Sequence, residues 1–265
     1  MAKKCRVDEL VVAQGLAPDL ETARRLIMAG EIRSGDRVWE KAGERLPVDA
    51  TLVHKPRHCR WVSRGGLKLE RAIAAFSMSV AGFRCLDIGA STGGFTDVLL
   101  HNKAAEVVAL DVGYGLLDAK IQNDPRVIVK DRTNFRLIAD DELGAPFDLA
   151  VTDVSFISLR HILPKAAAMI KDEGAIVALI KPQFEAARED VPEGGIIIDQ
   201  AVQLNIIAAL QEFCNTSAAI YLHALAPVPR VDARKNIEFL SLWKKSHNRM
   251  SEAQISAIIA AAHAA

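Results

Sequence analysis

One stretch of the chain decides its fold: Cys85-Leu86-Asp87-Ile88-Gly89-Ala90-Ser91-Thr92-Gly93-Gly94-Phe95-Thr96-Asp97-Val98-Leu99-Leu100. Its first four residues form an apolar run interrupted only by Asp87, which has the length of a buried strand. Gly89 permits a sharp reversal after that strand. From Phe95 onward apolar side chains recur at helical spacing, so a helix begins near Gly93-Gly94. The stretch therefore predicts a strand, a glycine turn and a helix whose N-terminal amides face a ligand.

The spacing of the glycines indicates which nucleotide this turn holds. A dinucleotide site has the pattern G-x-G-x-x-G, and a triphosphate loop ends in G-K-[S/T]. Residues 87–94 instead read D-x-G-x-x-x-G-G, which resembles the S-adenosylmethionine loop of Rossmann-like methyltransferases, where the acid orders the loop near the methionine amino group. A second acid, Asp111, ends the next apolar run, where such folds place a carboxylate on the ribose hydroxyls. A purely structural turn between strand and helix is the alternative.

Length and composition limit the class of protein. The 265 residues suffice for one sizeable α/β core and a small second module, and half of them are hydrophobic and a quarter charged, as in soluble globular proteins. The N-terminus lacks the apolar stretch of a signal peptide, and no segment is long and apolar enough to span a bilayer, so we expect a cytoplasmic protein with no membrane partner. The four cysteines form no C-x-x-C pair, so we expect neither a metal site nor a disulfide framework.

The charges are unevenly distributed although the net charge is zero. Residues 1–71 contain 15 Lys/Arg and 10 Asp/Glu, a balance of +5, which leaves −5 for residues 72–265. The most basic segment is 54–71, with six Lys/Arg, one Glu and Trp61 in its middle. Cationic side chains around an aromatic ring suit an RNA backbone with one stacked base, and a solvated linker is the alternative. The pair Gly65-Gly66 marks a hinge between two modules.

The first 60 residues predict a small RNA-binding module. Residues 6–15 and 19–29 have the spacing of two amphipathic helices, and short strand-like pieces of a small curled sheet follow. The segments R-V-D-E-L-V-V-A-Q-G-L and E-T-A-R-R-L-I-M-A-G-E-I resemble the RNA-binding domain named after ribosomal protein S-four, whose second helix faces RNA phosphates. A helical cap with solvated arginines is the alternative. The residues predicted to contact RNA are Arg6, Arg24, Arg25, Lys55, Arg57, Arg60, Trp61 and Arg64.

From Arg84 onward apolar runs alternate with helical patterns. Strands are expected near 84–88, 107–111, 126–129, 148–152 and 175–180, and helices after Gly93 and near 115–123, 159–171 and 199–213. Two more strands, 220–225 and 237–242, follow with no helix between them and are expected to pair antiparallel, before a helix at about 251–263.

The predicted fold class is α/β: a Rossmann-like S-adenosylmethionine-dependent methyltransferase with a doubly wound, mostly parallel seven-stranded sheet, preceded by a small N-terminal α+β S-four-like RNA-binding domain. The predicted domains are the S-four-like domain at 1–60, a basic interdomain linker at 61–67 and the methyltransferase domain at 68–265.

Polar residues at the strand ends are the candidates for chemistry, because ligands of an open parallel sheet gather there. Lys181 ends a buried apolar run, where desolvation lowers the pKa of a lysine and can make it a base. Asp153 ends the neighbouring strand and could pair with Lys181, and Glu238 opens the final strand. A structural salt-bridge network uses the same residue types and is the alternative. The predicted contacts of the cofactor, S-adenosylmethionine, are Asp87, Gly89, Ala90, Ser91, Gly93, Gly94, Phe95, Asp111, Asp131, Arg132 and Asp153.

Several motifs together resemble the TlyA family, which joins an S-four-like domain to an FtsJ-type ribose methyltransferase. They are Ser63-Arg64-Gly65-Gly66-x-Lys68-Leu69, the glycine loop, Asp131-Arg132-Thr133-Asn134, Asp153-Val154-Ser155-Phe156-Ile157-Ser158-Leu159, Lys181-Pro182-Gln183-Phe184-Glu185 and Asn236-x-Glu238-Phe239. FtsJ-like enzymes use a Lys-Asp-Lys-Glu tetrad, and the residues at those positions are Lys68, Asp153, Lys181 and Glu238. The resemblance implies methyl transfer from S-adenosylmethionine to the 2′-hydroxyl of a cytidine ribose in ribosomal RNA of one or both subunits. It requires no metal, and we expect a flipped-out target nucleotide and a monomeric protein.

The resemblance also implies a role for each tetrad residue. Lys181 is the base or the stabiliser of the alkoxide, Asp153 and Glu238 orient it, and Lys68 helps to position the target nucleotide. The rival from another class is a non-catalytic RNA-binding or ribosome-assembly protein that retains the fold, but such a protein needs no lysine at a strand end. A secreted haemolysin, a name historically attached to this family, would need a signal or membrane-active segment. The glycine spacing disfavours an NAD-dependent dehydrogenase.

Overall fold

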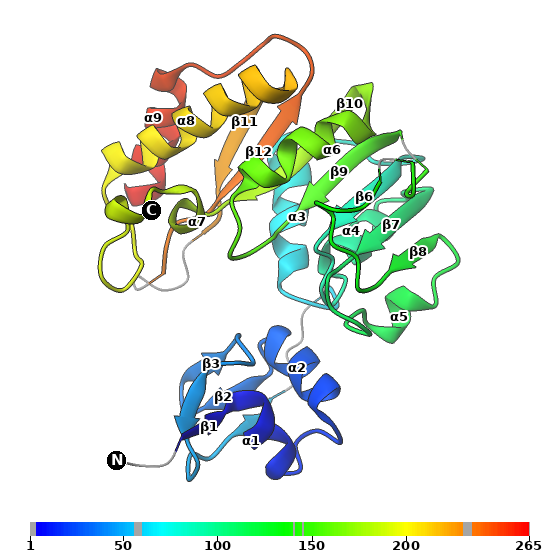
Figure 1. Ribbon diagram of the computed structural model, residues 1–265, viewed down its shortest axis with the longest axis vertical. Helices are drawn as coiled ribbons and strands as arrows, with labels where there is room; N and C mark the ends of the chain where they lie inside the picture. Colours follow the sequence, from blue (N-terminus) through cyan, green and yellow to red (C-terminus); the bar gives the residue numbers. More distant parts are fainter. Residues whose placement is uncertain (1–3, 56–59, 140, 145, 230–234, 265) are drawn as a thin grey trace.

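A computed structural model describes residues 4–55, 60–139, 141–144, 146–229 and 235–264. Figure 1 shows a small N-terminal body below a larger α/β body, with the polypeptide crossing between them once. Each body has its own hydrophobic core, since the cluster around Val7, Ile27 and Trp39 contains residues 5–52 only. The N-terminal part therefore packs as a separate unit.

The N-terminal body consists of two helices and two small sheets. Helix α1 (Val7–Ala13) packs on α2 (Leu20–Met28), whose first turn is capped by the Asp19 carboxylate accepting from the Thr22 amide at 2.7 Å. One antiparallel sheet pairs β1 (Lys4–Arg6) with β4 (Arg45–Pro47). The other has the order β3-β2-β5 and contains β2 (Ile32–Ser34), β3 (Arg37–Trp39) and β5 (Val53–His54). The prediction of a single curled sheet is wrong, because three-residue strands carry too little alternation to reveal β1 or its partner.

The larger body is built on one seven-stranded sheet with the order β11-β12-β10-β9-β6-β7-β8. Its strands are β6 (Arg84–Ile88), β7 (Glu106–Leu110), β8 (Val127–Lys130), β9 (Phe147–Thr152), β10 (Ile170–Ile180), β11 (Tyr221–Pro227) and β12 (Phe239–Lys244). Neighbouring strands are parallel except that β12 runs antiparallel to both β10 and β11. The predicted mostly parallel sheet and its final antiparallel pair are confirmed.

Helices cover both faces of the sheet (Figure 1). One face packs against α3 (Gly65–Ala75), α4 (Gly94–His101) and α5 (Ala119–Gln122), and the other against α6 (Leu163–Met169), α8 (Gln200–Ala218) and α9 (Glu252–Ala264). Shorter turns of helix lie at η1 (Leu159–His161), α7 (Pro182–Glu185) and η2 (Arg188–Asp190). Strand residues alternate between the two cores: Leu86 and Ile88 face α6 and α8, whereas Cys85 faces α3 and α4.

Several element boundaries differ from the predictions. The helix expected at 115–123 spans only Ala119–Gln122, because the carboxylates of Asp111 and Asp131 accept from the amides of Gly113 and Gly115 and hold the preceding residues in a turn. The helix expected at 159–171 is a short 3₁₀ turn, η1, followed by α6, and Ile162 lies between them with φ −113° and ψ −51°. Helix α3 begins at Gly65, so it overlaps the segment predicted as a linker.

Candidate active site

The four residues of the predicted tetrad meet at one edge of the sheet. Asp153 directly follows β9, and Lys181 directly follows β10, which is parallel to it. Glu238 directly precedes β12 and reaches the same edge because β12 is antiparallel to β10, with Phe239 opposite Ile180. Lys68 comes from α3, which contacts both α4 and β12. Because β12 lies next to β10 in the sheet, residues that are far apart in the sequence meet at this edge.

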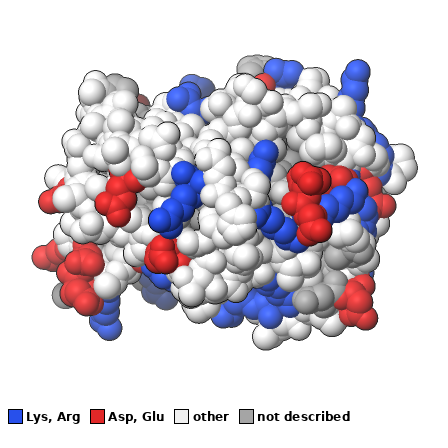
Figure 2. All heavy atoms as spheres, turned by 90° about the horizontal axis from the view of Figure 1, so that it is seen from above, with Lys and Arg blue, Asp and Glu red and all other residues white. Residues whose placement is uncertain are grey.

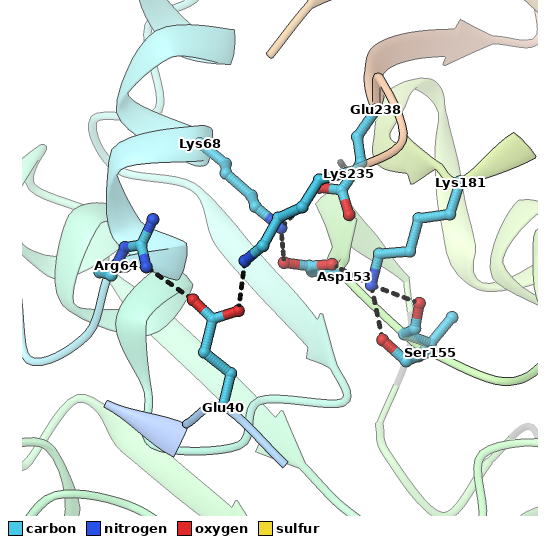
Figure 3. Close-up of polar contacts among 9 residues, drawn as sticks. Glu40, Arg64, Lys68, Asp153, Ser155, Lys181, Lys235 and Glu238 are labelled. Carbon is cyan, nitrogen blue, oxygen red and sulfur yellow. Dashed lines mark hydrogen bonds and ion pairs between the residues drawn. The ribbon is translucent and has the colours of Figure 1, made fainter. Parts of the chain in front are cut away.

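The tetrad forms a continuous chain of ion pairs (Figure 3). The Lys68 ammonium lies 2.9 Å from Asp153 Oδ2 and 2.9 Å from Glu238 Oε2, and the Lys181 ammonium lies 2.6 Å from Asp153 Oδ1. Lys181 Nζ also donates to the Val154 carbonyl at 2.9 Å and to Ser155 Oγ at 2.7 Å. Two ammonium groups thus face two carboxylates, and each Lys181 contact is to an oxygen that accepts.

Burial and charge act in opposite directions on these groups. Burial alone would lower the pKa of Lys68, but the carboxylates of Asp153 and Glu238 raise it to about 12. Burial would raise the pKa of Asp153, but Lys68 and Lys181 lower it below its usual value. The Lys181 side chain is only 7% exposed. Lys68 and Asp153 are therefore charged at neutral pH, and the nearly buried Lys181 side chain lies beside them at the strand edge.

The glycine loop lies beside the tetrad, at the carboxyl end of β6. Gly89 and Gly93 have φ values of 78° and 90°, in the left-handed region that glycine favours. A side chain on Gly93 would also collide with Leu117, 2.8 Å from its Cβ position. Helix α4 begins at Gly94, as predicted, so its N-terminal amides are at the loop. The loop thus exposes backbone where a ligand above β6 would lie.

Acidic residues at the carboxyl ends of β6, β7 and β8 organise this edge: Asp87 is the next-to-last residue of β6, Asp111 directly follows β7 and Asp131 directly follows β8. Asp87 is 1% exposed and accepts from Thr96 Oγ1 at 2.7 Å, and burial raises its pKa to about 7 against the hydrogen bonds from Thr96. Asp111 accepts from the amides of Ser91 at 2.9 Å and Gly113 at 2.8 Å, so it connects the glycine loop to the turn after β7. Among the described residues each of its oxygens accepts one amide hydrogen bond, which leaves a lone pair for a hydroxyl donor.

The turn after β8 stabilises the turn after β7. Asp131 accepts from the Gly115 amide at 3.0 Å, and the Arg132 amide donates to the Gly113 carbonyl at 2.8 Å. Arg132 has a φ of 52° and its guanidinium lies over the Tyr114 ring, 4.3 Å from the centroid. Asp131 and Arg132, which were both predicted to contact the cofactor, therefore lie next to the turn that follows Asp111.

These residues fit S-adenosylmethionine. The cofactor has an ammonium and a ribose diol as donors, and the site offers buried or backbone-fixed carboxylates on neighbouring strands together with open backbone at the glycines. Two predicted contacts have another role. Phe95 is 5% exposed and Ala90 is 6% exposed, and both pack in the core under α3 and α4, which leaves only their backbone atoms for a ligand.

Several residues predicted to bind RNA have partners within the protein. The guanidinium groups of Arg6 and Arg24 both pair with the fully buried Asp8, at 2.7 and 3.1 Å. Arg60 pairs with Glu70 at 2.8 Å, and Arg64 pairs with Glu40 at 2.6 Å. Arg25 donates to Thr22 at 3.3 Å, and Lys55 is exposed. Arg57 lies outside the described residues.

The prediction that Trp61 stacks on a base is wrong for this conformation. Trp61 is 4% exposed, packs in the core between α3 and α4, and donates through Nε1 to Glu70 at 3.1 Å. Its basic neighbours suggested an RNA contact, but its ring fills a hydrophobic gap beside the glycine loop.

The end of the molecule opposite the N-terminal body carries Lys and Arg interspersed with Asp and Glu (Figure 2).

Sequence reasoning missed four residues that shape the site. Ser155 holds Lys181 and Thr96 holds Asp87 through the hydrogen bonds described above. Ser155 lies in a motif already noted, so its place two residues after Asp153 could have identified it. Glu40 and Lys235 join by an ion pair of 2.6 Å, and no local pattern links residues this far apart.

None of the helices in the described ranges is long and apolar enough to cross a membrane. Within the same ranges no group of three or more His, Cys, Asp and Glu side chains could hold a metal ion.

Comparisons with known proteins agree with the geometry. A model of the FtsJ-like methyltransferase family matches residues 61–235. The chain is 44% identical over 211 residues to the 16S/23S rRNA (cytidine-2′-O)-methyltransferase TlyA of Mycobacterium tuberculosis, covering 79% of each chain. It is 38% identical over 242 residues to Hemolysin A of Brachyspira hyodysenteriae, covering 89% of this chain and 98% of that one.

A solved structure extends the similarity to the whole chain. A Streptococcus thermophilus protein, named as a candidate hemolysin, aligns with a TM-score of 0.74 and 38% identity over 100% of this chain and 97% of that one. The tetrad, the glycine loop and these similarities lead to one conclusion: the chain belongs to the TlyA family of FtsJ-like S-adenosylmethionine-dependent methyltransferases.

Proposed function

We propose that this protein transfers the methyl group of S-adenosylmethionine to the 2′-hydroxyl of a cytidine ribose in ribosomal RNA. The observation that carries the proposal is the position of Lys181, a buried ammonium at the strand edge, fixed by Asp153 at 2.6 Å beside the glycine loop. The similarity to an enzyme named for cytidine 2′-O-methylation supports this substrate.

The reaction requires positioning and the removal of one proton. A ribose 2′-hydroxyl is a weak nucleophile, and S-adenosylmethionine supplies a methyl group on a sulfonium, which is a strong electrophile. Lys181 Nζ would meet the 2′-oxygen and hold it in line with the methyl group. Because all of its contacts are acceptors, Nζ is arranged to donate and to stabilise the alkoxide. The hydroxyl proton would pass to solvent water, and the electron pair of the broken sulfur–methyl bond would stay on sulfur, which leaves as a neutral thioether.

The other tetrad residues keep Lys181 in place and approach the target nucleotide. Asp153 pairs with both Lys181 and Lys68, and Glu238 supplies the second negative charge beside Lys68. Lys68 would help to position the target nucleotide, and Asp87 and Asp111 would hold the cofactor ammonium and ribose. One chain supplies the complete tetrad, which supports a monomer as the active unit.

We further propose that residues 1–60 form an RNA-binding domain that delivers ribosomal subunits to the methyltransferase domain at 68–265. The separate hydrophobic core of the N-terminal body and its excess of basic residues support this division. A protein that modifies ribosomes works where ribosomes are assembled, so we place it in the cytoplasm.

The test is transfer of labelled methyl from S-adenosylmethionine to purified small and large ribosomal subunits from cells that lack this protein. We expect label on a cytidine ribose with the wild-type protein and none with Lys181→Ala, while both bind the cofactor with similar affinity in calorimetry. Lys171→Ala is the matched control, since Lys171 is an exposed lysine paired with Asp148. Cofactor binding without label on either subunit would favour a non-catalytic RNA-binding protein.

A further inference from the structure

Glu40 of the N-terminal body connects two cations of the methyltransferase body. Its Oε1 lies 2.6 Å from Arg64 Nη1 and its Oε2 lies 2.6 Å from Lys235 Nζ, so one carboxylate bridges two positive groups (Figure 3). Glu40 directly follows β3, and it is the one acidic group shown in Figure 3 that comes from the N-terminal body. The contact therefore joins the two bodies through a single anionic group.

Both cations lie next to the tetrad. Arg64 precedes Lys68 by about one helical turn at the start of α3, and Lys235 precedes Glu238 by three residues. Burial by itself would raise the pKa of the Glu40 carboxyl, but Lys235 and Arg64 lower it below its usual value. Lys68 acts in the same direction, so Glu40 lies within electrostatic reach of the tetrad.

A backbone phosphate of RNA matches this carboxylate in charge and in the number of oxygens that can accept from two cations. A phosphodiester carries one negative charge and two non-bridging oxygens, the same charge and the same number of acceptors that Glu40 presents to Arg64 and Lys235. The tetrad is neutral by itself, because Lys68 and Lys181 balance Asp153 and Glu238. An incoming phosphate would thus replace Glu40 without changing the net charge beside the tetrad.

We propose that Arg64 and Lys235 form a binding site for a backbone phosphate beside the target ribose, and that Glu40 occupies this site until RNA displaces it. The inference rests on the proposed function, since it takes RNA as the substrate. Arg64, at the start of the helix that carries Lys68, and Lys235, three residues before Glu238, would bind the phosphate together. The adjoining ribose would then lie at the tetrad.

The contacts of Glu40 are weak enough to exchange. The side chains of Glu40, Arg64 and Lys235 are 37%, 32% and 49% exposed, and ion pairs with this exposure contribute little to stability. The next residue, Lys41, lies over the ring of Phe156 at 5.2 Å from its centroid. This second contact between the bodies also involves an exposed side chain, as Phe156 is 72% exposed. The segment after β3 can therefore leave without disturbing either core.

The experiment measures RNA binding rather than methyl transfer. The probe is a fluorescent oligocytidylate of about ten nucleotides, compared in anisotropy titrations with the same sequence on an uncharged methylphosphonate backbone. Glu40→Gln, which keeps the shape of the side chain and removes its charge, should tighten binding of the phosphodiester probe by about three- to tenfold and leave binding of the uncharged probe unchanged. Glu44→Gln is the matched control, since Glu44 pairs with Arg37 inside the N-terminal body.

The two cations are tested in the same assay. Arg64→Gln and Lys235→Gln should each weaken binding of the phosphodiester probe by about three- to tenfold. Each should also reduce the slope of log Kd against log salt concentration by about 0.7, the value for one phosphate contact on a single strand. A merely structural tether between the bodies would not change this slope.

The outcomes separate the two proposals. If Glu40→Gln binds the probe no more tightly than the wild type, Glu40 is an interdomain tether and the inference is overturned. Unchanged salt slopes in both cation variants would place the phosphate elsewhere and also overturn it. If the predicted binding changes appear but ribosomal subunits receive no methyl group, the phosphate site stands and the proposed reaction fails.

Discussion

Lys181 and Asp153 form an ion pair of 2.6 Å between Nζ and Oδ1, at the carboxyl ends of two adjacent parallel strands. The other oxygen of the same carboxylate, Oδ2, lies 2.9 Å from Lys68 Nζ. A single carboxylate thus pairs with two ammonium groups, one of them almost fully buried, and Glu238 supplies the second negative charge. Asp153 is the residue that connects the two lysines of the tetrad.

Asp153→Asn should abolish methyl transfer and destabilise the fold. The substitution keeps the shape of the side chain but leaves Lys181 without a counter-charge, and unpairing a buried ion costs about 3 kcal/mol. We expect a loss of at least about a hundredfold in single-turnover rate and a lower midpoint in urea unfolding. Asp172→Asn is the control, since Asp172 is 96% exposed and pairs with Lys245 at the surface. If Asp153→Asn were as stable as the wild type, Lys181 would not depend on Asp153 as its counter-charge.

Asp87→Asn should stabilise the cofactor-free protein at high pH. Burial raises the pKa of Asp87 from 3.8 to about 7, so the folded protein holds this proton more tightly than the unfolded chain. The contribution of Asp87 to stability is therefore complete below about pH 4 and lost as the pH rises to about 7. An asparagine remains neutral and avoids the loss, so we expect a free energy of unfolding about 2 kcal/mol higher than in the wild type at pH 8.

The pH dependence tests the cause of this difference. Urea unfolding of both proteins at pH 4 and pH 8 should show the gain only at pH 8. The affinity for S-adenosylmethionine should fall in Asp87→Asn, since the charge below the loop is lost. An equal stability difference at both pH values would show that ionisation of Asp87 is not responsible.

Gly66→Ala should destabilise the junction between α3 and the glycine loop. A Cβ on Gly66 would lie 2.6 Å from Trp61 Cβ and 2.9 Å from the Gly94 carbonyl oxygen. Relieving this overlap must move α3 away from α4, which costs about 1–3 kcal/mol. Gly65→Ala is the matched control, because its Cβ meets only Ser63 Oγ at 3.4 Å. Thermal melting and cofactor titration of the two variants should differ clearly, and equal behaviour would mean that the junction is loosely packed.

Deleting residues 1–60 should weaken binding to ribosomal RNA while the remaining chain stays folded. The N-terminal body has a separate core, so its removal exposes little of the other cores. Residues 1–60 contain 12 Lys/Arg and 9 Asp/Glu, a charge balance of +3, which favours a polyanion. Filter binding at physiological salt should show the loss, and circular dichroism should show an intact fold. Unchanged affinity would assign RNA binding to residues 61–265.

Local patterns in the sequence were sufficient for most of the fold and for three residues of the tetrad, Asp153, Lys181 and Glu238. The strand, glycine turn and helix around Gly89 are specified by residues within one turn of one another, and the alternation of apolar runs gave the parallel sheet and the antiparallel pair β11 and β12. Side chains at strand ends could be placed together because parallel strands end at a common edge. Lys68 was assigned by resemblance to a family, since nothing in its own helix indicates its partners.

Contacts between distant segments were decided only by the tertiary structure. Trp61 and Arg24 lie in basic surroundings, yet the ring of Trp61 is buried and Arg24 is held by Asp8. Glu40 meets Lys235 because the two bodies pack against each other, and sequence separation carries no information about such a meeting. Periodicity follows from backbone geometry that every segment shares, so the sequence alone determines the elements and their order. Which charges neutralise each other depends on distances of a few ångströms between elements, and those distances exist only once the cores have packed.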